Sequence, residues 1–266
     1  MGLDLRGQAA VVAGGAGGLR SATVRHLAAH GAGVVILDVD EAAAHALVDE
    51  LDGPATAVTG DALDDDAIGT AIESARTFGA FTVAVSATGV VIPSRRLVSR
   101  SGSILDLDVF QKNFDLHVLG PVNLARHAAA AFATNAPDDD GQRGVVVLTA
   151  SISAFDGQVS MVPYAAAKGA VVSMVLPMAR DLAPLGVRVC AIAPGGFVTP
   201  RVSDPAVQNL LAEDTVFPRR LGRPDEFAEL VGSIVANPYL NGEVIRLDGA
   251  TRLSPQMGPP PSMDSR

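Results

Sequence analysis

The stretch Ala13-Gly14-Gly15-Ala16-Gly17-Gly18-Leu19-Arg20 ends the apolar run Ala9–Ala13 and leads into the helical pattern Ser21–His30. Glycines between a strand and a helix let backbone amides and the helix N-terminus approach a diphosphate closely. Asp38 follows the second apolar run and lies 24 residues after Gly14, close to the ~20 expected for a carboxylate that binds an adenosine ribose. These residues predict a dinucleotide site and favour NAD over NADP, because Asp38 would repel the 2′-phosphate of NADP.

Short apolar runs and helical patterns alternate along the rest of the chain. The predicted strands are Ala9–Ala13, Val34–Leu37, Ala55–Val58, Val83–Val85, Val145–Leu148, Val187–Ala193 and Glu243–Leu247. The predicted helices are Ser21–His30, Glu41–Leu51, Asp64–Phe78, Leu107–Ala133, Tyr164–Leu182 and Asp225–Ala236. Nearly continuous apolar strands joined by helices are typical of a parallel sheet covered on both faces, with right-handed crossovers. We therefore expect an α/β protein, a single-domain doubly wound Rossmann fold with a seven-stranded parallel sheet over residues 1–255, followed by a mobile tail at 256–266.

Three segments between these elements are predicted to be loops. They are Val91–Leu105, Pro137–Arg143 and Gly195–Pro224. The last is the longest, and a long loop inside a compact domain is usually a lid or a binding loop.

The composition excludes several classes of protein. With 266 residues, 48% of them hydrophobic and 18% charged, the chain can bury a large core and is not a disordered segment. The net charge of −9 disfavours a nucleic-acid partner and an anionic membrane surface. Cys190 is the only cysteine, so we expect no internal disulfide and no cysteine metal site, and a reducing, cytoplasmic setting fits best. No segment predicts a transmembrane helix, and Met1–Gln8 lacks the features of a signal peptide.

Ser151, Tyr164 and Lys168 form a second group of interest. Tyr164 and Lys168 lie four residues apart on a predicted helix and share a face, whereas Ser151 follows a predicted strand and is expected at the ligand crevice. An ammonium group beside a phenol lowers the phenol pKa from its usual ~10. Tyr164 could then exchange a proton, with Lys168 supplying the charge and Ser151 hydrogen-bonding a substrate oxygen. The alternative is a core tyrosine and a surface lysine, but the preceding dinucleotide motif favours catalysis.

With these motifs in place, the chain resembles the short-chain dehydrogenase/reductase family from about Leu5 to Leu253. The segments that carry the resemblance are Gly14–Arg20, Asp61-Ala62, Ser86-Ala87-Thr88-Gly89, Tyr164-Ala165-Ala166-Ala167-Lys168 and Pro194-Gly195. Four further segments are similar to the type 2 3-hydroxyacyl-CoA dehydrogenase group within this family, namely Gly141–Gly144, Ala154–Val159, Ala179–Pro184 and Asn241–Ala250.

The resemblance implies a homotetrameric, NAD-dependent enzyme that interconverts a secondary alcohol and a ketone. The implied substrates are 3-hydroxyacyl-CoA thioesters, with steroids or other alcohols and ketones as alternatives. Tyr164 would take or give the hydroxyl proton, Lys168 would also hold the nicotinamide ribose, and Thr199 would contact the carboxamide. Asp61 and Ala62 would contact adenine. The full set of implied cofactor-binding residues is Gly14, Gly18, Leu19, Asp38, Asp61, Ala62, Gly89, Tyr164, Lys168, Pro194, Gly195 and Thr199.

Three features depart from the family pattern. Arg20 stands where the glycine loop normally ends in glycine, so its side chain must turn outward or toward the diphosphate. Ser86 and Thr88 alter the Asn-Ala-Gly element of the family. His117 stands where the family usually has an asparagine near Lys168, and its imidazole either relays a proton or packs inside its helix. The competing hypothesis is therefore a catalytically weak, cofactor-sensing or structural oligomer.

Two groups of basic residues remain. Arg95, Arg96 and Arg100 lie in a predicted loop where the substrate pocket of the family opens, and they could bind the phosphates of coenzyme A or form solvated surface. The histidines other than His117 lie on predicted helices without a ligand pattern, so no metal site is expected. They are His26, His30, His45 and His127.

Overall fold

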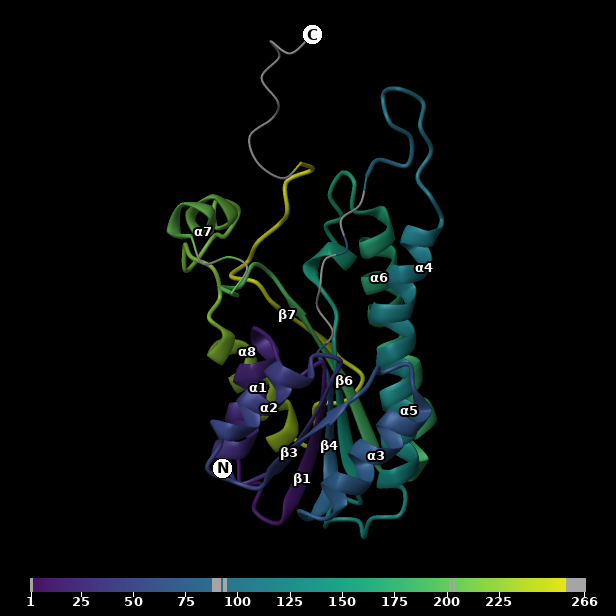
Figure 1. Cartoon of the computed structure of the whole chain (residues 1–266), viewed down its shortest axis with the longest axis vertical. Helices are drawn as coiled ribbons and strands as arrows, with labels where there is room; N and C mark the ends of the chain where they lie inside the picture. The colour runs from purple at the N-terminus through teal and green to yellow at the C-terminus, as the bar shows by residue number, and fades with distance from the viewer. Residues whose placement is uncertain (1, 88–91, 93–94, 201, 203, 257–266) are drawn as a thin grey trace.

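The computed structural model describes residues 2–87, 92, 95–200, 202 and 204–256. Its seven parallel strands follow the order β3-β2-β1-β4-β5-β6-β7 (Figure 1). Their bounds are β1 Gln8–Ala13, β2 Gly33–Asp38, β3 Ala55–Thr59, β4 Ala80–Ser86, β5 Gly144–Thr149, β6 Val187–Pro194 and β7 Val244–Leu247. The predicted doubly wound sheet is confirmed, and its strand ends differ from the predicted ones by at most three residues.

The central strand β1 shows why its sequence is apolar throughout. Ala9 and Val11 belong to the core on one face of the sheet, whereas Ala10 and Val12 belong to the core on the other face. Because successive side chains of a strand point to opposite faces, a strand covered on both sides has no position for a polar residue.

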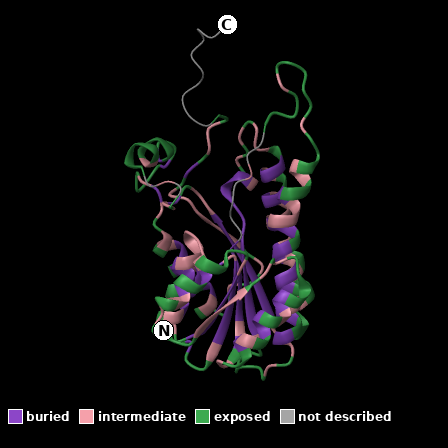
Figure 2. Ribbon diagram, viewed as in Figure 1, coloured by how far each residue is buried: buried purple, intermediate pink, exposed green. Residues whose placement is uncertain are grey.

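Helices cover both faces of this sheet (Figure 1). The helices on one face are α1 (Leu19–Ala29), α2 (Glu41–Asp49) and α8 (Pro224–Ala236), and those on the other are α3 (Asp65–Arg76), α5 (Gly120–Phe132) and α6 (Val162–Leu182). Figure 2 shows the strands buried between the two helical layers. Aspartates fix two helix starts, since Asp40 accepts the N–H of Ala43 at 3.0 Å and Asp64 accepts that of Asp66 at 2.9 Å.

The single helix predicted over Leu107–Ala133 is divided. Helix α4 spans Asp108–Phe114, a π-helical turn, η1, spans Asp115–Leu119, and α5 follows directly. Pro121 explains the interruption, because it has no N–H to donate to the carbonyl of His117, four residues earlier. Hydrophobic periodicity alone did not reveal this change of helical pitch.

The predicted loop Gly195–Pro224 contains a helix that the sequence pattern missed. Helix α7 spans Pro205–Leu211 and lies at the upper left of the view, on the opposite side from α4 (Figure 1). Asp204 caps it by accepting the N–H of Ala206 at 2.8 Å. The helix has only seven residues, none of them buried, and its apolar side chains Val207, Leu210 and Leu211 are exposed. The apolar pattern is therefore too short for the periodicity on which the prediction depends. Of the predicted mobile tail, residues 257–266 lie outside the described residues.

Helix α6 with its extension, Val162–Leu185, is long and apolar enough to cross a membrane by length and composition. Its inner side chains Val171 and Val175 belong instead to the core against the sheet. The helix also buries the ammonium group of Lys168 completely. These contacts are those of a core helix in an α/β protein.

Candidate active site

A cavity of about 400 Å³ opens at the carboxyl ends of β1, β2 and β3. It lies beside the point between β1 and β4 where the strand order reverses, which is where open α/β sheets bind ligands. Its wall includes four of the predicted cofactor residues, Gly14, Asp38, Asp61 and Ala62, together with Arg20. The structure thus brings together residues that are up to 48 positions apart in the sequence.

The glycine loop has the shape that a diphosphate requires. Gly14 and Gly18 have φ angles of 71° and 53°, which favour glycine, and a Cβ on Gly15 would lie 2.8 Å from Cγ2 of Ile36. Helix α1 begins at Leu19 without a side-chain cap, so its first amides can bind an anion. These features fit a dinucleotide, and Thr199 lies next to Gly18, since Cγ2 of the threonine is 3.4 Å from a Cβ built on that glycine.

Asp38 is fixed at the edge of the cavity by two backbone amides. Oδ2 accepts the N–H of Ala16 at 2.9 Å, and Oδ1 accepts the N–H of Asp40 at 3.1 Å. Each carboxylate oxygen keeps a further lone pair for a ribose hydroxyl. The carboxylate therefore links the glycine loop to the end of β2 and adds a negative charge to the cavity.

Arg20 turns toward the cavity and not away from the protein. Its Nε donates to the carbonyl of Gly17 at 3.0 Å, and the side chain forms part of the cavity wall. The helix therefore accommodates the large residue by folding its side chain back over the glycine loop. Of the two orientations considered from the sequence, the one that faces the diphosphate site is observed.

Ser151, Tyr164 and Lys168 come together in a second group, which does not line the 400 Å³ cavity. Tyr164 lies in the first turn of α6, and Lys168, one turn later, is completely buried and donates from Nζ to the carbonyl of Thr149 at 2.8 Å. The Lys168 Nζ lies 5.9 Å from the centre of the Tyr164 ring. Ser151 caps η2 (Ile152–Ala154) and accepts the N–H of Ser153 at 3.1 Å. The alternative of a surface lysine is therefore wrong.

The pKa of Tyr164 shifts in the direction opposite to the predicted one. Burial raises the pKa of Tyr164 above its usual 10.0, and a hydrogen bond with Ser151 opposes this effect. Burial, together with the charge of Arg20, lowers the pKa of Lys168 to about 7. The predicted lowering of the Tyr164 pKa is wrong for the protein alone, because removal from water disfavours the phenolate and the ammonium alike.

His117 joins the same group from η1. Its ring is completely buried and meets the Tyr164 ring edge-on, with 5.2 Å between the ring centres. One turn earlier, the buried Asn113 donates from Nδ2 to the carbonyl of Val109 at 2.7 Å, and its Oδ1 has no hydrogen-bond partner among the described residues. Sequence reasoning did not single out Asn113, although a polar residue at the core-facing side of a helical pattern is a usable signal.

The remaining predicted cofactor-binding residues either do not line the 400 Å³ cavity or lie outside the described residues. Leu19 begins α1, and Pro194 ends β6. Gly195 packs against β7, where its N–H donates to the carbonyl of Leu247 at 3.0 Å, and neither Pro194 nor Gly195 lines the 400 Å³ cavity. Gly89 lies outside the described residues. Within the described ranges, no group of three or more histidine, cysteine or acidic residues could hold a metal ion.

The sequence profile of the short chain dehydrogenases matches residues 8–208. The chain therefore belongs to the short-chain dehydrogenase family and is an oxidoreductase enzyme.

Three individual proteins show which members of the family this chain is similar to. The human 3-hydroxyacyl-CoA dehydrogenase type-2 is 42% identical over 255 residues, which cover 95% of this chain and 98% of the relative. The crystal structure of 3-hydroxyacyl-CoA dehydrogenase type-2 from Mycobacterium avium superposes with a TM-score of 0.91 at 44% identity, covering 94% of this chain and 97% of that one. A 7α-hydroxysteroid dehydrogenase complexed with NADH and 7-oxo glycochenodeoxycholic acid has a TM-score of 0.80 at 26% identity, covering 94% and 96%.

Proposed function

We propose that this protein is an NAD-dependent dehydrogenase that interconverts 3-hydroxyacyl-CoA and 3-ketoacyl-CoA thioesters. The observation that carries the proposal is the buried group of Ser151, Tyr164 and Lys168 beside a cavity that contains Asp38. The similarity to 3-hydroxyacyl-CoA dehydrogenases type-2, at 42–44% identity over nearly the whole chain, supports this substrate class.

Tyr164, Ser151 and Lys168 have different roles in the proposed reaction. A nicotinamide cofactor supplies the two-electron acceptor or donor when bound. The Tyr164 hydroxyl exchanges the proton of the substrate oxygen, and Ser151 orients that oxygen. Burial moves the pKa of the Tyr164 phenol further above its usual 10.0, so the phenol of the cofactor-free protein carries the proton that ketone reduction needs. For alcohol oxidation, the phenol must first lose its proton, and Lys168 stabilises the resulting negative charge when it is protonated.

The negative charge of Asp38 favours NAD over NADP. The Asp38 carboxylate would repel a 2′-phosphate and accept hydrogen bonds from unmodified ribose hydroxyls. It lies at the cavity edge without a basic side chain bonded to it among the described residues. This arrangement supports NAD.

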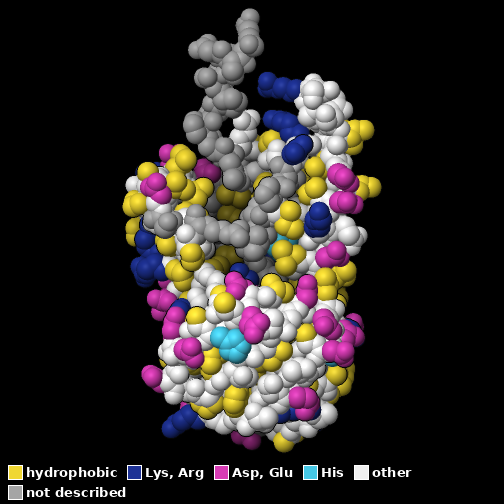
Figure 3. All heavy atoms as spheres, viewed as in Figure 1, with side chains coloured by type: hydrophobic (Ala, Val, Ile, Leu, Met, Phe, Trp, Pro, Cys, Tyr) yellow, Lys and Arg dark blue, Asp and Glu magenta, His cyan; other side chains and the backbone are white. Residues whose placement is uncertain are grey.

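A basic hairpin supports a thioester of coenzyme A. Residues 97–105 fold back on themselves, with the Leu105 N–H donating to the Leu97 carbonyl at 2.9 Å. Arg100 lies in this hairpin, Arg95 and Arg96 directly precede it, and all three side chains are exposed. Figure 3 shows Lys and Arg side chains gathered at the upper right, where this loop lies in Figure 1. Three guanidinium groups on one projecting loop of a protein with net charge −9 can pair with phosphates.

The first experiment is a titration with NADH and NADPH, followed by nicotinamide fluorescence. Tight binding of NADH and weak binding of NADPH is the expected result, and failure to bind NADH overturns the proposal. The second step compares a 3-hydroxyacyl-CoA with the same acyl group on N-acetylcysteamine, which lacks the phosphates. Replacing all three arginines with Gln should raise KM roughly tenfold for the CoA thioester only, whereas equal effects on both would remove the phosphate role.

A hydroxysteroid or carbonyl reductase is the second candidate. The observation that favours it is the structural likeness to the 7α-hydroxysteroid dehydrogenase, because substrate choice depends on loops that vary within one fold. Turnover of hydroxysteroids at a higher kcat/KM than that of any 3-hydroxyacyl-CoA would establish it. Binding of NADH without turnover of either class would instead indicate the cofactor-sensing hypothesis.

We also propose that the enzyme is a cytoplasmic homotetramer. The resemblance to the family supports the tetramer, and Leu119 of η1 and Leu176 of α6 are exposed apolar side chains that an interface on this helical layer would cover. The free, buried Cys190 is compatible with a reducing compartment. Light scattering on the purified protein tests the first part, since a mass near the 27.2 kDa of one chain would contradict it. Imaging of the tagged protein in its own cell tests the second.

A further inference from the structure

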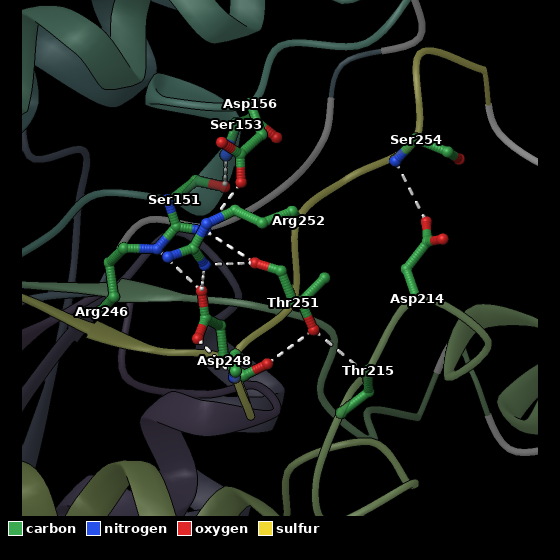
Figure 4. Close-up of polar contacts among 11 residues, drawn as sticks. Ser151, Ser153, Asp156, Asp214, Thr215, Arg246, Asp248, Thr251, Arg252 and Ser254 are labelled. Carbon is green, nitrogen blue, oxygen red and sulfur yellow. Dashed lines mark hydrogen bonds and ion pairs between the residues drawn. The ribbon is translucent and has the colours of Figure 1, made fainter.

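Arg246 is the centre of a half-buried charge network that includes Asp156, in the turn that follows Ser151 (Figure 4). Its Nη2 pairs with Oδ2 of Asp156 at 2.7 Å, and its Nε pairs with Oδ2 of Asp248 at 2.8 Å. The same Nη2 donates to the carbonyl of Thr251 at 2.9 Å. The guanidinium carbon also lies 5.1 Å from the ring centre of Phe155.

The burial of these charges makes the network costly to break. The side chains of Arg246, Asp156 and Asp248 are 21%, 18% and 7% exposed. Hydrogen bonds between ionised groups are stronger than those between neutral ones, and the Arg246 side chain lowers the pKa of Asp156. Removing one member would leave the others partly buried without their partner.

Asp156 connects the network to the catalytic serine. It ends the turn that begins at Ser151, and the N–H groups of Phe155 and Asp156 both donate to the carbonyl of Ile152 at 2.9 Å. The Ser151 Oγ is held inside the same turn by the N–H of Ser153. A displacement of Asp156 would therefore move the backbone that orients the Ser151 hydroxyl.

Asp248 and the segment after it hold the other side of the network. A Cβ on Gly195 would lie 2.9 Å from Cβ of Asp248, so β7 and the loop after β6 are in close contact. The C-terminal strap, which we define as residues 251–256, then crosses the catalytic loop. There Gln158 donates from Nε2 to the carbonyl of Ser254 at 2.9 Å, and Ser254 also reaches Asp214 near α7 at 3.2 Å.

We propose that Arg246 is a positioning residue, which holds the Ser151 hydroxyl in its reactive place by clamping Asp156 to β7 and to the C-terminal strap. It does not line the cavity that contains Asp38 and acts through the Ser151 turn. The inference rests on the proposed function only in that Ser151 contacts the substrate oxygen. Sequence reasoning could not find it, because the guanidinium and its first carboxylate are 90 residues apart.

The test uses the full chain with four variants: Arg246→Met, Arg246→Lys, Asp156→Asn and Arg252→Met. Arg252 is the matched control, because its side chain is 65% exposed and lies 3.5 Å from Oδ2 of Asp248. Its charge acts on Asp156, but no hydrogen bond or ion pair joins the two side chains among the described residues. Lysine retains the charge of Arg246 but cannot bind two carboxylates at once in a fork. The readouts are kcat and KM, NADH affinity, and hydrogen exchange of the peptide that contains residues 151–161.

Asp156→Asn and Arg246→Met should lower kcat roughly 10- to 100-fold, the effect of a misplaced reacting group, with NADH affinity within about twofold of the wild type. Arg246→Lys should recover part of the loss, and Arg252→Met should resemble the wild type. In the double variant, adding Asp156→Asn to Ser151→Ala should lower kcat by less than about twofold relative to Ser151→Ala alone, because both substitutions act through the Ser151 hydroxyl. Independent, multiplying losses would overturn the proposal.

Hydrogen exchange separates this proposal from the proposed function. It should be faster in residues 151–161 of Asp156→Asn and Arg246→Met but not of Arg252→Met, whatever substrate the enzyme uses. Unchanged exchange overturns the positioning role even if activity falls. Faster exchange in a protein that oxidises no 3-hydroxyacyl-CoA would overturn the substrate proposal and support the role of Arg246 in fixing the turn.

Discussion

The imidazole ring of His117 lies edge-on to the phenol ring of Tyr164, with 5.2 Å between ring centres and an angle of 86° between their planes. Both residues are buried. The contact exists because the π-helical turn η1 places His117 against the first turn of α6. A second proton-carrying side chain, the His117 imidazole, thus lies against the residue proposed to exchange the substrate proton.

His117→Phe should retain the aromatic packing on Tyr164 but remove proton exchange at this position. We expect kcat to fall roughly 10- to 100-fold, with NADH affinity retained. His117→Asn, which introduces the residue usual in the family, should keep kcat closer to that of the wild type and alter the pH profile. Steady-state rates across pH measure this, and a fully active His117→Phe would mean that the imidazole only packs.

Tyr164→Phe should lower kcat by at least about 100-fold, because a positioned acid or base contributes 10²–10⁴ to the rate. The ring and its packing remain, so the protein should still bind NADH in a fluorescence titration. The control is Tyr239→Phe, which changes the other tyrosine of the chain at a position that is 97% exposed. Equal activity of the two variants, with chemistry limiting the rate, would refute the proposed role of Tyr164.

Lys168 should make stability depend on pH in a defined direction. Its pKa falls from 10.5 to about 7 in the folded protein. Between these values, the unfolded chain binds a proton at Lys168 that the folded chain does not, so the free energy of unfolding rises with pH. The slope from this group is at most ~1.4 kcal/mol per pH unit and disappears below pH ~7, where both states are protonated.

Lys168→Met removes this contribution and serves as the reference. Urea unfolding at about pH 6, 7, 8 and 9 should show the wild type gaining stability relative to the variant only above about pH 7. Burial also raises the pKa of Cys190, which lowers stability at alkaline pH in both proteins and cancels in the comparison. The pKa of Tyr164 is raised above its usual 10.0, so its phenol stays protonated over this pH range. Parallel stability curves would show that the Lys168 ammonium is not desolvated.

Arg20→Met should weaken NADH binding about tenfold, because it removes a cation from the cavity that holds the diphosphate. Methionine keeps the stem that packs over the glycine loop, and salt should reduce the difference between the two proteins. Fluorescence titrations at low and high ionic strength measure both effects. Tighter binding in the variant would indicate that Arg20 obstructs the site, as the cofactor-sensing hypothesis requires.

Asp38→Asn should reduce the preference for NADH over NADPH by about tenfold, because the amide no longer repels the 2′-phosphate. The amide oxygen can still accept the N–H of Ala16 and hold the glycine loop, whereas the amide NH2 cannot accept the N–H of Asp40. Asp49→Asn, an exposed change of the same charge on α2, is the control. If both variants shift the preference equally, net charge and not the ribose contact determines the cofactor choice.

The parts of the fold that the sequence predicted share one physical property. Strands such as β1 are buried on both faces, and their unbroken apolar runs therefore identify them without knowledge of their neighbours. Helix α7 has no buried residue, and its signals are short and local: the pair Asp204 and Pro205 at its start, and the helical spacing of Val207, Leu210 and Leu211. The π-helical turn η1 has a local cause in Pro121, but periodicity does not distinguish a kink from a shift in helical pitch.

In the candidate site, too, some features are predictable from the sequence and others are not. Gly14 and Asp38 are recognisable because the motif fixes their spacing, and Tyr164 and Lys168 because they are one helical turn apart. The direction of the Tyr164 pKa shift was not predictable, since it depends on whether burial outweighs the charge of Lys168. The pairing of Arg246 with Asp156 depends on how distant segments pack, which a single sequence does not show.

The residues that line the dinucleotide cavity all lie between Gly14 and Gly120. The strand that clamps the Ser151 turn, β7, comes more than 120 residues later. During synthesis on the ribosome, the chain therefore contains the whole wall of this cavity well before it contains Arg246. The catalytic turn takes its final form last, so a nascent chain holds the residues that form the cavity before it holds those needed for turnover.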